Sequence, residues 1–220
     1  MKCKLVAVSE PRISQCSTAE ELVAYCARVS NPANQNNKET SAKLIKYLVD
    51  NHHWSPLEMV SLTIEIETTR DIGRQILRHR SFSFQEFSQR YAEALDFSTP
   101  REARLQDAKN RQNSVQTDDD ELAKWWCLTQ QEIQYVASNN YQVALAKGIA
   151  KEQARAILPE GLTMSRLYMS GTLRSWVHYC LLRMENGTQK EHADIAKACW
   201  EIICTEFPSI ASLVGDPNGI

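Results

Sequence analysis

The most regular pattern in the chain is the alternation of apolar and polar residues over positions 60–67. Successive side chains of a β-strand point to opposite faces, so this alternation predicts a strand with one buried face. Shorter apolar segments predict further strands at residues 5–8 and 162–170. The apolar positions of the main strand are Val60, Leu62, Ile64 and Ile66.

Helices are predicted where apolar residues recur every three or four positions. Thr18 and Glu21 have the spacing of a capping box, and the helix that follows carries Leu22, Cys26 and Val29 on one face. A second helix is expected after the polar break that follows, and a third directly after the main strand.

The second half of the chain is predicted to be mainly helical, with Gly148 ending the longest helix. Thr188 and Glu191 have the spacing of another capping box. Residues 98–120 are polar and are interpreted as a long loop. The helices of this half are expected at residues 121–147, 151–158, 172–185 and 188–206.

Together these elements predict an α+β fold that is mostly helical, with a mixed sheet and flanking helices. A chain of 220 residues with 43% hydrophobic residues can bury one sizeable core. Residues 1–220 are therefore expected to form a single domain, and no internal repeat is visible.

Composition narrows the class of protein. No apolar run approaches the roughly 20 residues that span a bilayer, and the first strand does not resemble a secretory segment, so a cytoplasmic protein is expected. The seven cysteines contain no Cys-x-x-Cys pair, which argues against a disulfide framework and a zinc site. No Gly-x-Gly-x-x-Gly motif follows a strand, so side chains would have to hold any phosphate group.

Positive charge is concentrated in the segment that follows the main strand. Residues 70–90 contain five arginines and two acidic residues, which gives this segment a net charge of +3, whereas the whole chain carries −2. Arg70, Arg74 and Arg78 recur every four residues and are predicted to line one helix face, where guanidinium groups can bind phosphate oxygens. The alternative is that these arginines form surface ion pairs, with Asp71 and Glu86 as partners.

The string from Arg78 to Arg90 resembles the signature of the flavin-dependent thymidylate synthases, an Arg-His-Arg followed after seven residues by Ser. Other strings of that family occur in the right order over roughly residues 20–207. They are Ala27-Arg28-Val29-Ser30, His53-Trp54-Ser55-Pro56-Leu57-Glu58, Gln75, Ala154-Arg155 with Leu158-Pro159, and Leu173-Arg174-Ser175 with Leu182-Arg183. The chain departs from the residues common in the family at Met59, Gln85, Thr172, His178 and Gly187.

The resemblance implies a methyltransferase that converts dUMP to dTMP by reductive methylation. Methylenetetrahydrofolate would supply the carbon, and FAD reduced by NADPH would supply the hydride. The family's fold is an α/β core flanked by helices, and its members are homotetramers with active sites shared between subunits.

The resemblance also implies a role for individual residues. Residues implied at the flavin are Ser30, His53, Ser55, Glu58, Arg78, His79, Arg80, Gln85, Arg174 and His178. Residues implied at dUMP are Gln75, Glu86, Ser88, Gln89, Arg90, Arg155 and Arg183. Within this set Arg90 and Arg155 are assigned to the phosphate, and Arg183 to the uracil edge as the catalytic residue.

A helical wheel places Arg174 and Arg183 about 180° apart on one helix. They can hardly serve one pocket together on a rigid helix. Either the two belong to different shared sites, or Arg183 leaves a frayed helix end.

Rival functions come from other classes of protein. A nucleotide-binding or RNA-binding regulatory protein without catalysis could use the same arginines. A thymidylate synthase with a cysteine nucleophile would make the same product, but no cysteine here has the Pro-Cys context of that family. His52 and His53 lack a supporting cluster of metal ligands, so no metal site is expected. A nucleic-acid partner and a membrane partner are not expected either.

Overall fold

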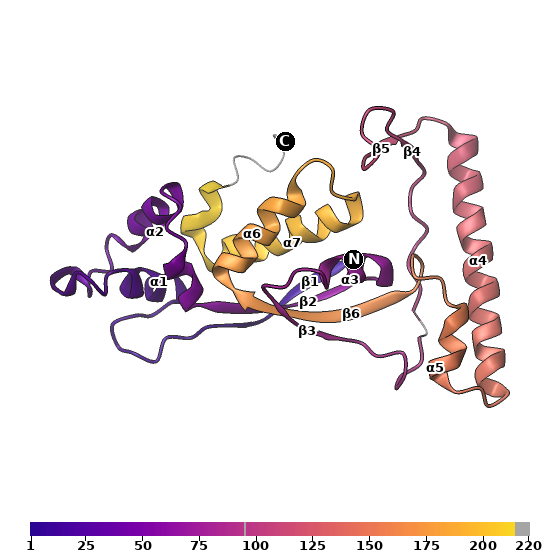
Figure 1. Cartoon of the computed structure of the whole chain (residues 1–220), viewed down its shortest axis with the longest axis horizontal. Coiled ribbons are helices and arrows are strands. Elements are labelled where there is room, and N and C mark those ends of the chain that lie inside the picture. The colour runs from indigo at the N-terminus through magenta and orange to yellow at the C-terminus, as the bar shows by residue number, and fades with distance from the viewer. Residues whose placement is uncertain (95, 214–220) are drawn as a thin grey trace.

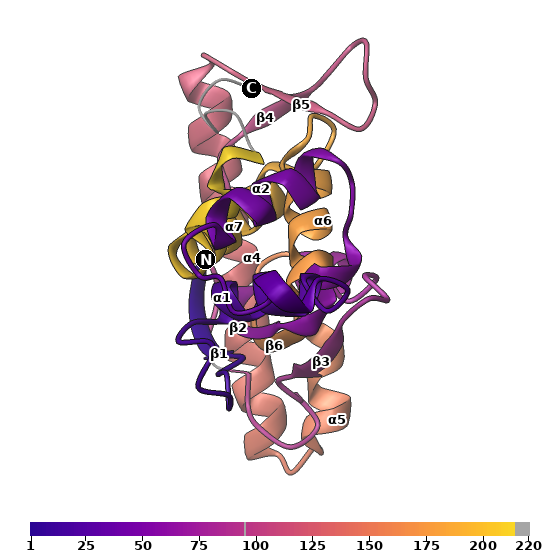
Figure 2. The same ribbon diagram turned by 90° about the vertical axis from the view of Figure 1, so that its left-hand side faces the viewer.

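The computed structural model describes residues 1–94 and 96–213, and its centre is a four-stranded sheet in the order β1-β2-β6-β3. Helices α6 and α7 lie together over one face of this sheet (Figures 1 and 2). The strands are β1 (Lys2–Val8), β2 (Ser61–Thr69), β6 (Met164–Thr172) and β3 (Ser83–Glu86).

All three strand pairs of the central sheet are antiparallel, so the prediction of a mixed sheet is wrong. The reason is the order of elements: α6 and α7 follow the last strand of the sheet and do not connect two of its neighbouring strands, as the helix of a parallel crossover would. The α+β class itself is confirmed, and helical residues outnumber strand residues in the described ranges.

The strand predicted from alternation is β2, and its pattern decides which face is buried. Leu62, Ile64 and Ile66 are at most 1% exposed, whereas the residues between them are only partly buried. Burying one such side chain contributes about 1.5–3 kcal/mol. The indole Nε1 of Trp176 donates to the carbonyl oxygen of Leu62 over 3.2 Å and so ties α6 to the middle of the sheet.

Helix α6 (Leu173–Met184) starts directly where β6 ends, and α7 (Lys190–Glu206) packs beside it. The hydroxyl of Thr172 caps α6 by accepting a hydrogen bond from the backbone N–H of Ser175 over 3.3 Å. The capping box predicted at Thr188 and Glu191 is wrong. The residue before α7 is Gln189, and the carboxylate of Glu191 is buried against an arginine of another segment instead.

Two N-terminal helices pack beside the sheet, α1 (Ala19–Ala27) and α2 (Ser41–Asp50). The first capping box is confirmed, since Thr18 Oγ1 accepts from the backbone N–H of Glu21 over 3.1 Å. The helix ends before Val29, which is 68% exposed and does not belong to the apolar face predicted for it. Short 3-10 turns follow as η1 (Pro32–Asn34) and η2 (Ser55–Met59).

The long predicted helix is α4 (Asp120–Ala146), which stands at one end of the sheet in Figure 1. Gly148 ends it with a φ of +83°, a conformation that favours glycine. The next predicted helix is shorter than expected and splits into α5 (Lys151–Ala154) and the 3-10 turn η3 (Arg155–Ile157). A separate small core holds this part together: Ala94, Tyr141, Ala154 and Leu158.

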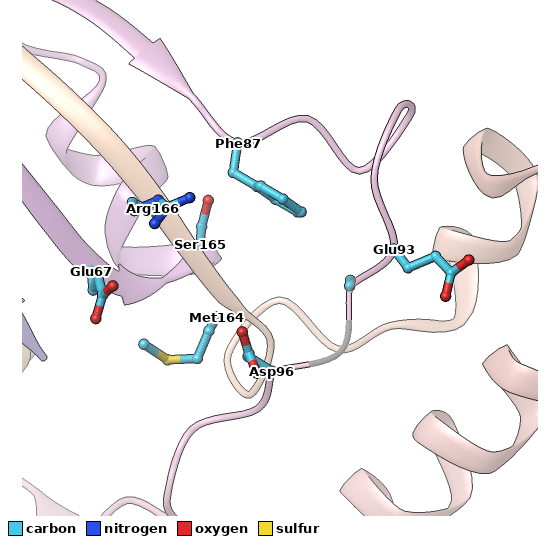
Figure 3. A pocket seen from close by; sticks show the side chains of 8 residues that line it. Glu67, Phe87, Glu93, Asp96, Met164, Ser165 and Arg166 are labelled. Atoms are coloured by element: carbon cyan, nitrogen blue, oxygen red, sulfur yellow. The ribbon is translucent and has the colours of Figure 1, made fainter.

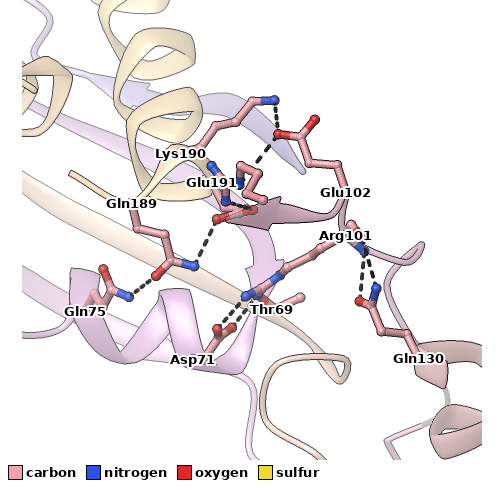
Figure 4. A network of polar contacts seen from close by, with 10 residues as sticks. Thr69, Asp71, Gln75, Arg101, Glu102, Gln130, Gln189, Lys190 and Glu191 are labelled. Atoms are coloured by element: carbon pink, nitrogen blue, oxygen red, sulfur yellow. Dashed lines mark hydrogen bonds and ion pairs between the residues drawn. The ribbon is translucent and has the colours of Figure 1, made fainter. Parts of the chain in front are cut away.

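The long loop predicted at residues 98–120 contains a small hairpin, β4 (Arg104–Gln106) paired with β5 (Ser114–Gln116). Its strands have three residues each and are largely exposed, so no hydrophobic alternation marks them in the sequence. The loop is also held by Arg101, which bonds Asp71 at 2.8 Å and exchanges backbone hydrogen bonds with Gln130 of α4 (Figure 4). The remaining elements are α3 (Arg70–Ile76) and η4 (Pro208–Leu213).

Candidate functional site

The first group of predicted site residues lies where η2 meets the start of α6. Glu58 and Arg174 form an ion pair, although they are 116 positions apart in the chain. One helical turn after Arg174, the ring of His178 packs edge-on against Trp54 with ring centroids 4.7 Å apart. Burial, and then the charge of Arg174, lower the pKa of His178. The group therefore combines a fixed cation with an imidazole that stays neutral at neutral pH.

A second group lies at the far end of α6, against the segment that follows α3. Arg183 Nε donates to His79 Nε2 over 2.9 Å, and the ring of Tyr179 packs edge-on against His79 at 4.8 Å. A guanidinium has only donors, so His79 must accept at Nε2 and carry its proton on Nδ1. Burial, followed by the charge of Arg183, lowers the pKa of His79, which agrees with a neutral ring.

The two arginines of α6 thus have different partners, as the helical wheel implied. Arg174 bonds Glu58 at the start of the helix, and Arg183 bonds His79 at its end. Arg183 is the eleventh of the twelve residues of α6 and is still helical, so the alternative of a frayed helix end is not needed.

The arginine face predicted for residues 70–78 is wrong for its first two members. Arg70 is 9% exposed and lies 3.7 Å from the carboxylate of Glu86, and Arg74 bonds Glu160 at 2.7 Å. Arg78 lies beyond the end of α3. The alternative of ion pairs therefore holds for Arg70 with Glu86, whereas Asp71 pairs with Arg101.

Arg78 and Arg80 are the arginines of this segment that remain available. Both are exposed, and neither makes an ion pair or side-chain hydrogen bond within residues 1–94 and 96–213. Exposed guanidinium groups without an internal acid can accept an outside anion at little cost. The other exposed residues of the predicted flavin set are Ser30, His53, Ser55 and Gln85.

Glu86 is fixed by its neighbours. Its Oε1 accepts from the hydroxyl of Ser165 over 2.9 Å and lies 3.7 Å from Arg70. The carboxylate is therefore held at the end of β3 by Arg70, the ion-pair partner that the alternative interpretation allowed, and by Ser165, which the sequence analysis did not single out.

A third group lies in the turn after β3 and at the start of η3. Arg90 lies 3.5 Å from the carboxylate of Glu152, and Arg155 donates to the backbone oxygen of the same residue over 3.3 Å. Ser88 Oγ accepts from the backbone N–H of Arg90 over 3.4 Å. Gln89 is 3% exposed, and its Nε2 has no hydrogen-bond partner among the described residues. A buried donor of this kind fits a ligand acceptor, since buried polar groups are normally paired.

The first and third groups lie at opposite ends of β6. Arg174 follows the end of this strand, whereas the segment of Arg90 runs beside its beginning, where Phe87 donates to the backbone oxygen of Arg166 over 2.8 Å. Nine strand residues span about 30 Å. Groups so far apart in one chain cannot touch the same small ligand.

Two polar residues that the sequence analysis missed contact the second group through Gln75 and Tyr179, namely Gln189 and His192. Gln75 bonds Gln189 and His192 of the segment around the start of α7, and His192 also bonds Tyr179. His192, to which the sequence analysis assigns no role, is fully buried. A histidine and a glutamate side by side on the apolar face of α7 were the available signal, because such residues need partners when buried.

A cavity of about 250 Å³ lies beside the start of β6, but it does not contain the predicted site (Figure 3). Four residues of the segment after β3 line it, Phe87, Glu93, Ala94 and Asp96, but none of the predicted dUMP or flavin residues does. Three carboxylates surround it, which makes it a poor place for a phosphate. Its lining residues are Glu67, Phe87, Glu93, Ala94, Asp96, Met164, Ser165 and Arg166.

Two further findings concern the described ranges alone. No group of three or more histidine, cysteine, aspartate or glutamate side chains there could hold a metal ion. No helix of those ranges has the length and apolar character needed to cross a membrane.

Comparison with known proteins gives a consistent result. Residues 12–209 match the protein family described as thymidylate synthase complementing protein. The chain is 52% identical to a probable flavin-dependent thymidylate synthase of Paramecium bursaria Chlorella virus 1, over 96% of this chain and 97% of the relative. It is 47% identical to a flavin-dependent thymidylate synthase of Synechocystis sp., over 96% and 98%. Among solved structures it resembles the UMP/dUMP methylase PolB of Streptomyces cacaoi bound with 5-Br dUMP, with a TM-score of 0.80, 26% identity and coverage of 96% and 94%.

Proposed function

The chain belongs to the flavin-dependent thymidylate synthase family, and from this premise we propose that it methylates dUMP reductively to dTMP. Methylenetetrahydrofolate is the carbon donor, and FAD reduced by NADPH is the hydride carrier. The observation that carries this function is the identity of 52% and 47% with two such enzymes over nearly the whole chain. The protein is therefore a methyltransferase.

The side chains fit FAD without a glycine-rich phosphate loop. The free guanidinium groups of Arg78 and Arg80 suit the diphosphate, because charge-assisted hydrogen bonds compensate the loss of water around the anion. The group around Glu58, Arg174 and His178 suits the ring system, with its mixture of charge, an imidazole and the ring of Trp54. Bound FAD would supply the hydride that completes the methyl group.

We assign dUMP to Gln75, Glu86, Ser88, Gln89, Arg90, Arg155 and Arg183. Arg90 and Arg155 meet at Glu152 and are proposed to bind the phosphate together. The buried, unpaired Nε2 of Gln89 supports this assignment, since an acceptor of the nucleotide would satisfy it.

Arg183 is the proposed catalytic residue. Its partner His79 is neutral, so the positive charge of Arg183 is not neutralised by that contact. A fixed cation at the uracil edge would stabilise negative charge that develops on the ring during reaction. Cys180 is fully buried, and burial raises the pKa of its thiol far above the usual value, so this neighbour is not suited to act as a nucleophile.

We propose a homotetramer with sites shared between subunits. Two observations support it. The separation of Arg174 from Arg90 along β6 favours a site in which the two arginines come from different chains. Helix α4 also presents large apolar side chains that are more than half exposed in the single chain, and such faces mark protein interfaces. They include Trp125 at 58%, Leu128 at 54%, Tyr135 at 73% and Val136 at 51% exposure.

The alternative is a nucleotide-binding or RNA-binding regulatory protein without catalysis. It would bind through the same arginines, but it would contain no flavin and form no dTMP. The main proposal, a thymidylate synthase, also includes a single domain over residues 1–220 and a cytoplasmic location. It includes neither a nucleic-acid partner nor a membrane partner.

The test is to purify the protein, record its visible spectrum and assay dTMP formation with dUMP, methylenetetrahydrofolate and NADPH. A flavin spectrum and FAD-dependent turnover are expected. Arg183→Ala should keep the flavin but lower kcat by about 10²–10³-fold, as removal of one charge-stabilising donor does elsewhere. Wild-type protein that binds dUMP yet lacks flavin and turnover would favour the regulatory alternative.

A further inference from the structure

A chain of hydrogen bonds connects a buried ion pair to Gln75. Arg104 bonds the carboxylate of Glu191 at 2.7 Å, and the two side chains are only 14% and 8% exposed. Gln189 Nε2 donates to Glu191 Oε2 over 2.9 Å, and Gln75 Nε2 donates to Gln189 Oε1 over 2.8 Å. Figure 4 shows this row of contacts from Glu191 through Gln189 to Gln75.

The chain of hydrogen bonds continues into the core beyond Gln75. His192 Nδ1 lies 3.2 Å from Gln75 Oε1, and His192 Nε2 lies 3.1 Å from the hydroxyl of Tyr179. His192 is fully buried and Tyr179 is 2% exposed, so water does not replace these partners. The ring of Tyr179 also packs on His79 of the candidate site.

The ion pair fixes the direction of every hydrogen bond in this row. An ionised carboxylate has only acceptors, so Gln189 must turn its amide nitrogen to Glu191 and its oxygen to Gln75. Gln75 then turns its nitrogen to Gln189 and its oxygen to His192. Although burial favours the neutral acid, hydrogen bonds and the nearby arginines lower the pKa of Glu191 below its usual value.

The far end of the row agrees with this direction. Gln75 Oε1 requires a proton on Nδ1 of His192, and the neutral ring then accepts from Tyr179 at Nε2. Burial, followed by the charge of Arg183, lowers the pKa of His192 to about 4, so the ring is neutral near pH 7. One arrangement of donors and acceptors therefore satisfies the whole row: Glu191, Gln189, Gln75, His192 and Tyr179.

Reversing the amide of Gln75 alone would create two clashes of like groups. Its nitrogen would face the N–H of His192, and its oxygen would face the oxygen of Gln189. Each side-chain amide has two N–H groups and two lone pairs, so Gln75 keeps one of each for a ligand. The order in which it offers them is fixed by Glu191.

That order distinguishes two pyrimidine bases. Uracil offers a donor at N3 and an acceptor at O4, whereas cytosine offers an acceptor at N3 and a donor at its amino group. An amide that can turn over pairs with either base, but a fixed amide pairs with one. A site with buried, oriented polar groups rejects an analogue with the opposite pattern, because its own groups are then left unpaired.

We propose that the Arg104–Glu191 ion pair, acting through Gln189, fixes the side-chain amide of Gln75 and thereby makes the site select a uracil nucleotide over a cytosine nucleotide. The proposal rests on the proposed function, in which Gln75 contacts dUMP. Glu191, Gln189 and His192 are positioning residues, since they act on the ligand only through Gln75.

Glu191→Gln tests the proposal because the glutamine side chain has nearly the same shape as the glutamate side chain, but it is no longer restricted to accepting hydrogen bonds. A glutamine at this position can donate as well as accept. The whole row can then reverse, with His192 moving its proton to Nε2 and Tyr179 accepting there, and every group remains paired. Because Arg104 continues to donate to the oxygen of the new glutamine side chain, the amide nitrogen of that side chain turns to Gln189, and the reversed orientation of Gln75 becomes accessible.

The measurement is calorimetry of dUMP and dCMP with flavin-loaded wild-type and variant protein. The ratio of the dCMP and dUMP dissociation constants should fall about tenfold or more in Glu191→Gln. Glu102→Gln is the matched control, because Glu102 also lies near Arg104, at 3.6 Å, but outside the row, and its ratio should equal that of wild type. A structural defect without loss of orientation would weaken both nucleotides equally and leave the ratio unchanged.

Gln189→Ala is a second variant that keeps the buried ion pair and cuts the connection to Gln75. It should also lower the ratio, and it serves if Glu191→Gln does not fold. An unchanged ratio in a folded variant that binds dUMP would overturn the proposal and leave the proposed function intact. Wild-type protein that does not bind dUMP would overturn both.

Discussion

Arg183 Nε lies 2.9 Å from His79 Nε2 and donates a hydrogen bond to it, which joins residues 104 positions apart. Because the imidazole is neutral, the guanidinium meets no opposite charge there, and its own charge in turn disfavours protonation of the ring. The pair therefore presents a cation and a neutral imidazole side by side at the end of α6. This is the arrangement on which the proposed role of Arg183 depends.

Arg78→Ala and Arg80→Ala should each weaken FAD binding about tenfold or more. The chain has no glycine-rich phosphate loop that could replace these side chains, and a hydrogen bond to a charged group contributes about 1.5–3 kcal/mol. Flavin titration followed by fluorescence measures the effect. Arg74→Ala is the matched control, since Arg74 is bonded to Glu160 and should leave the affinity unchanged. Wild-type affinity in both Arg78 and Arg80 variants would rule out this assignment.

Arg90→Ala should remove most of the preference for dUMP over deoxyuridine. The two ligands differ only in the phosphate, and Arg90 and Arg155 are proposed to bind it. Calorimetry of both ligands with wild type and variant measures the preference. Lys151→Ala provides a nearby control, because Lys151 bonds the backbone oxygen of Tyr91 and is not assigned to the ligand. If the variant discriminates as well as wild type does, Arg90 does not contact the phosphate.

A mixture of Arg90→Ala and Arg174→Ala proteins should recover part of the activity that each has lost. In a tetramer with shared sites, some sites of a mixed assembly receive both arginines from unaltered chains. Activity after mixing and equilibration, compared with each variant alone, is the readout. No recovery despite subunit exchange would place both residues in a site built by one chain.

The assembly itself is checked separately by light scattering. Tyr135→Glu should lower the measured mass, because it puts a charge on the apolar face of α4, where Tyr135 is 73% exposed in the single chain. Lys124→Glu places the same side chain on α4 at a position that is exposed and already polar, and should have little effect. A wild-type protein that is monomeric at assay concentration would contradict the tetramer.

Stability should fall as the pH is lowered from about 6.5 towards 4, with His192 as one cause. In the unfolded chain this histidine takes up a proton near its ordinary pKa, whereas in the folded protein burial holds the pKa at about 4. The unfolded state therefore binds more protons in this window, which favours unfolding by up to about 3 kcal/mol.

Urea unfolding of wild type and His192→Asn at pH 7.5 and 4.5 measures this contribution. The asparagine keeps a donor for Gln75 and does not titrate, so its stability should depend less on pH than that of wild type. Equal pH dependence of the two proteins would show that the folded pKa of His192 is not depressed.

The sequence by itself determined the elements whose signals are local. The alternation of apolar residues decided which face of β2 is buried, and Thr18 with Glu21 fixed the start of α1. Both depend on residues within a few positions of one another, so the periodicity of strand and helix is sufficient. The motifs around Arg78 to Arg90 are local too, and they are sufficient to indicate the family.

Only the tertiary structure decided which polar groups meet. The spacing of Arg70 and Arg74 predicted a phosphate-binding face, yet both arginines are engaged by Glu86 and Glu160, the latter 86 positions from Arg74. Likewise the partners of Gln75 lie 114 and 117 positions away. Such contacts arise from the way helices and strands pack, and desolvation then makes each buried group depend on the partner it finds. No local pattern in the chain records that choice.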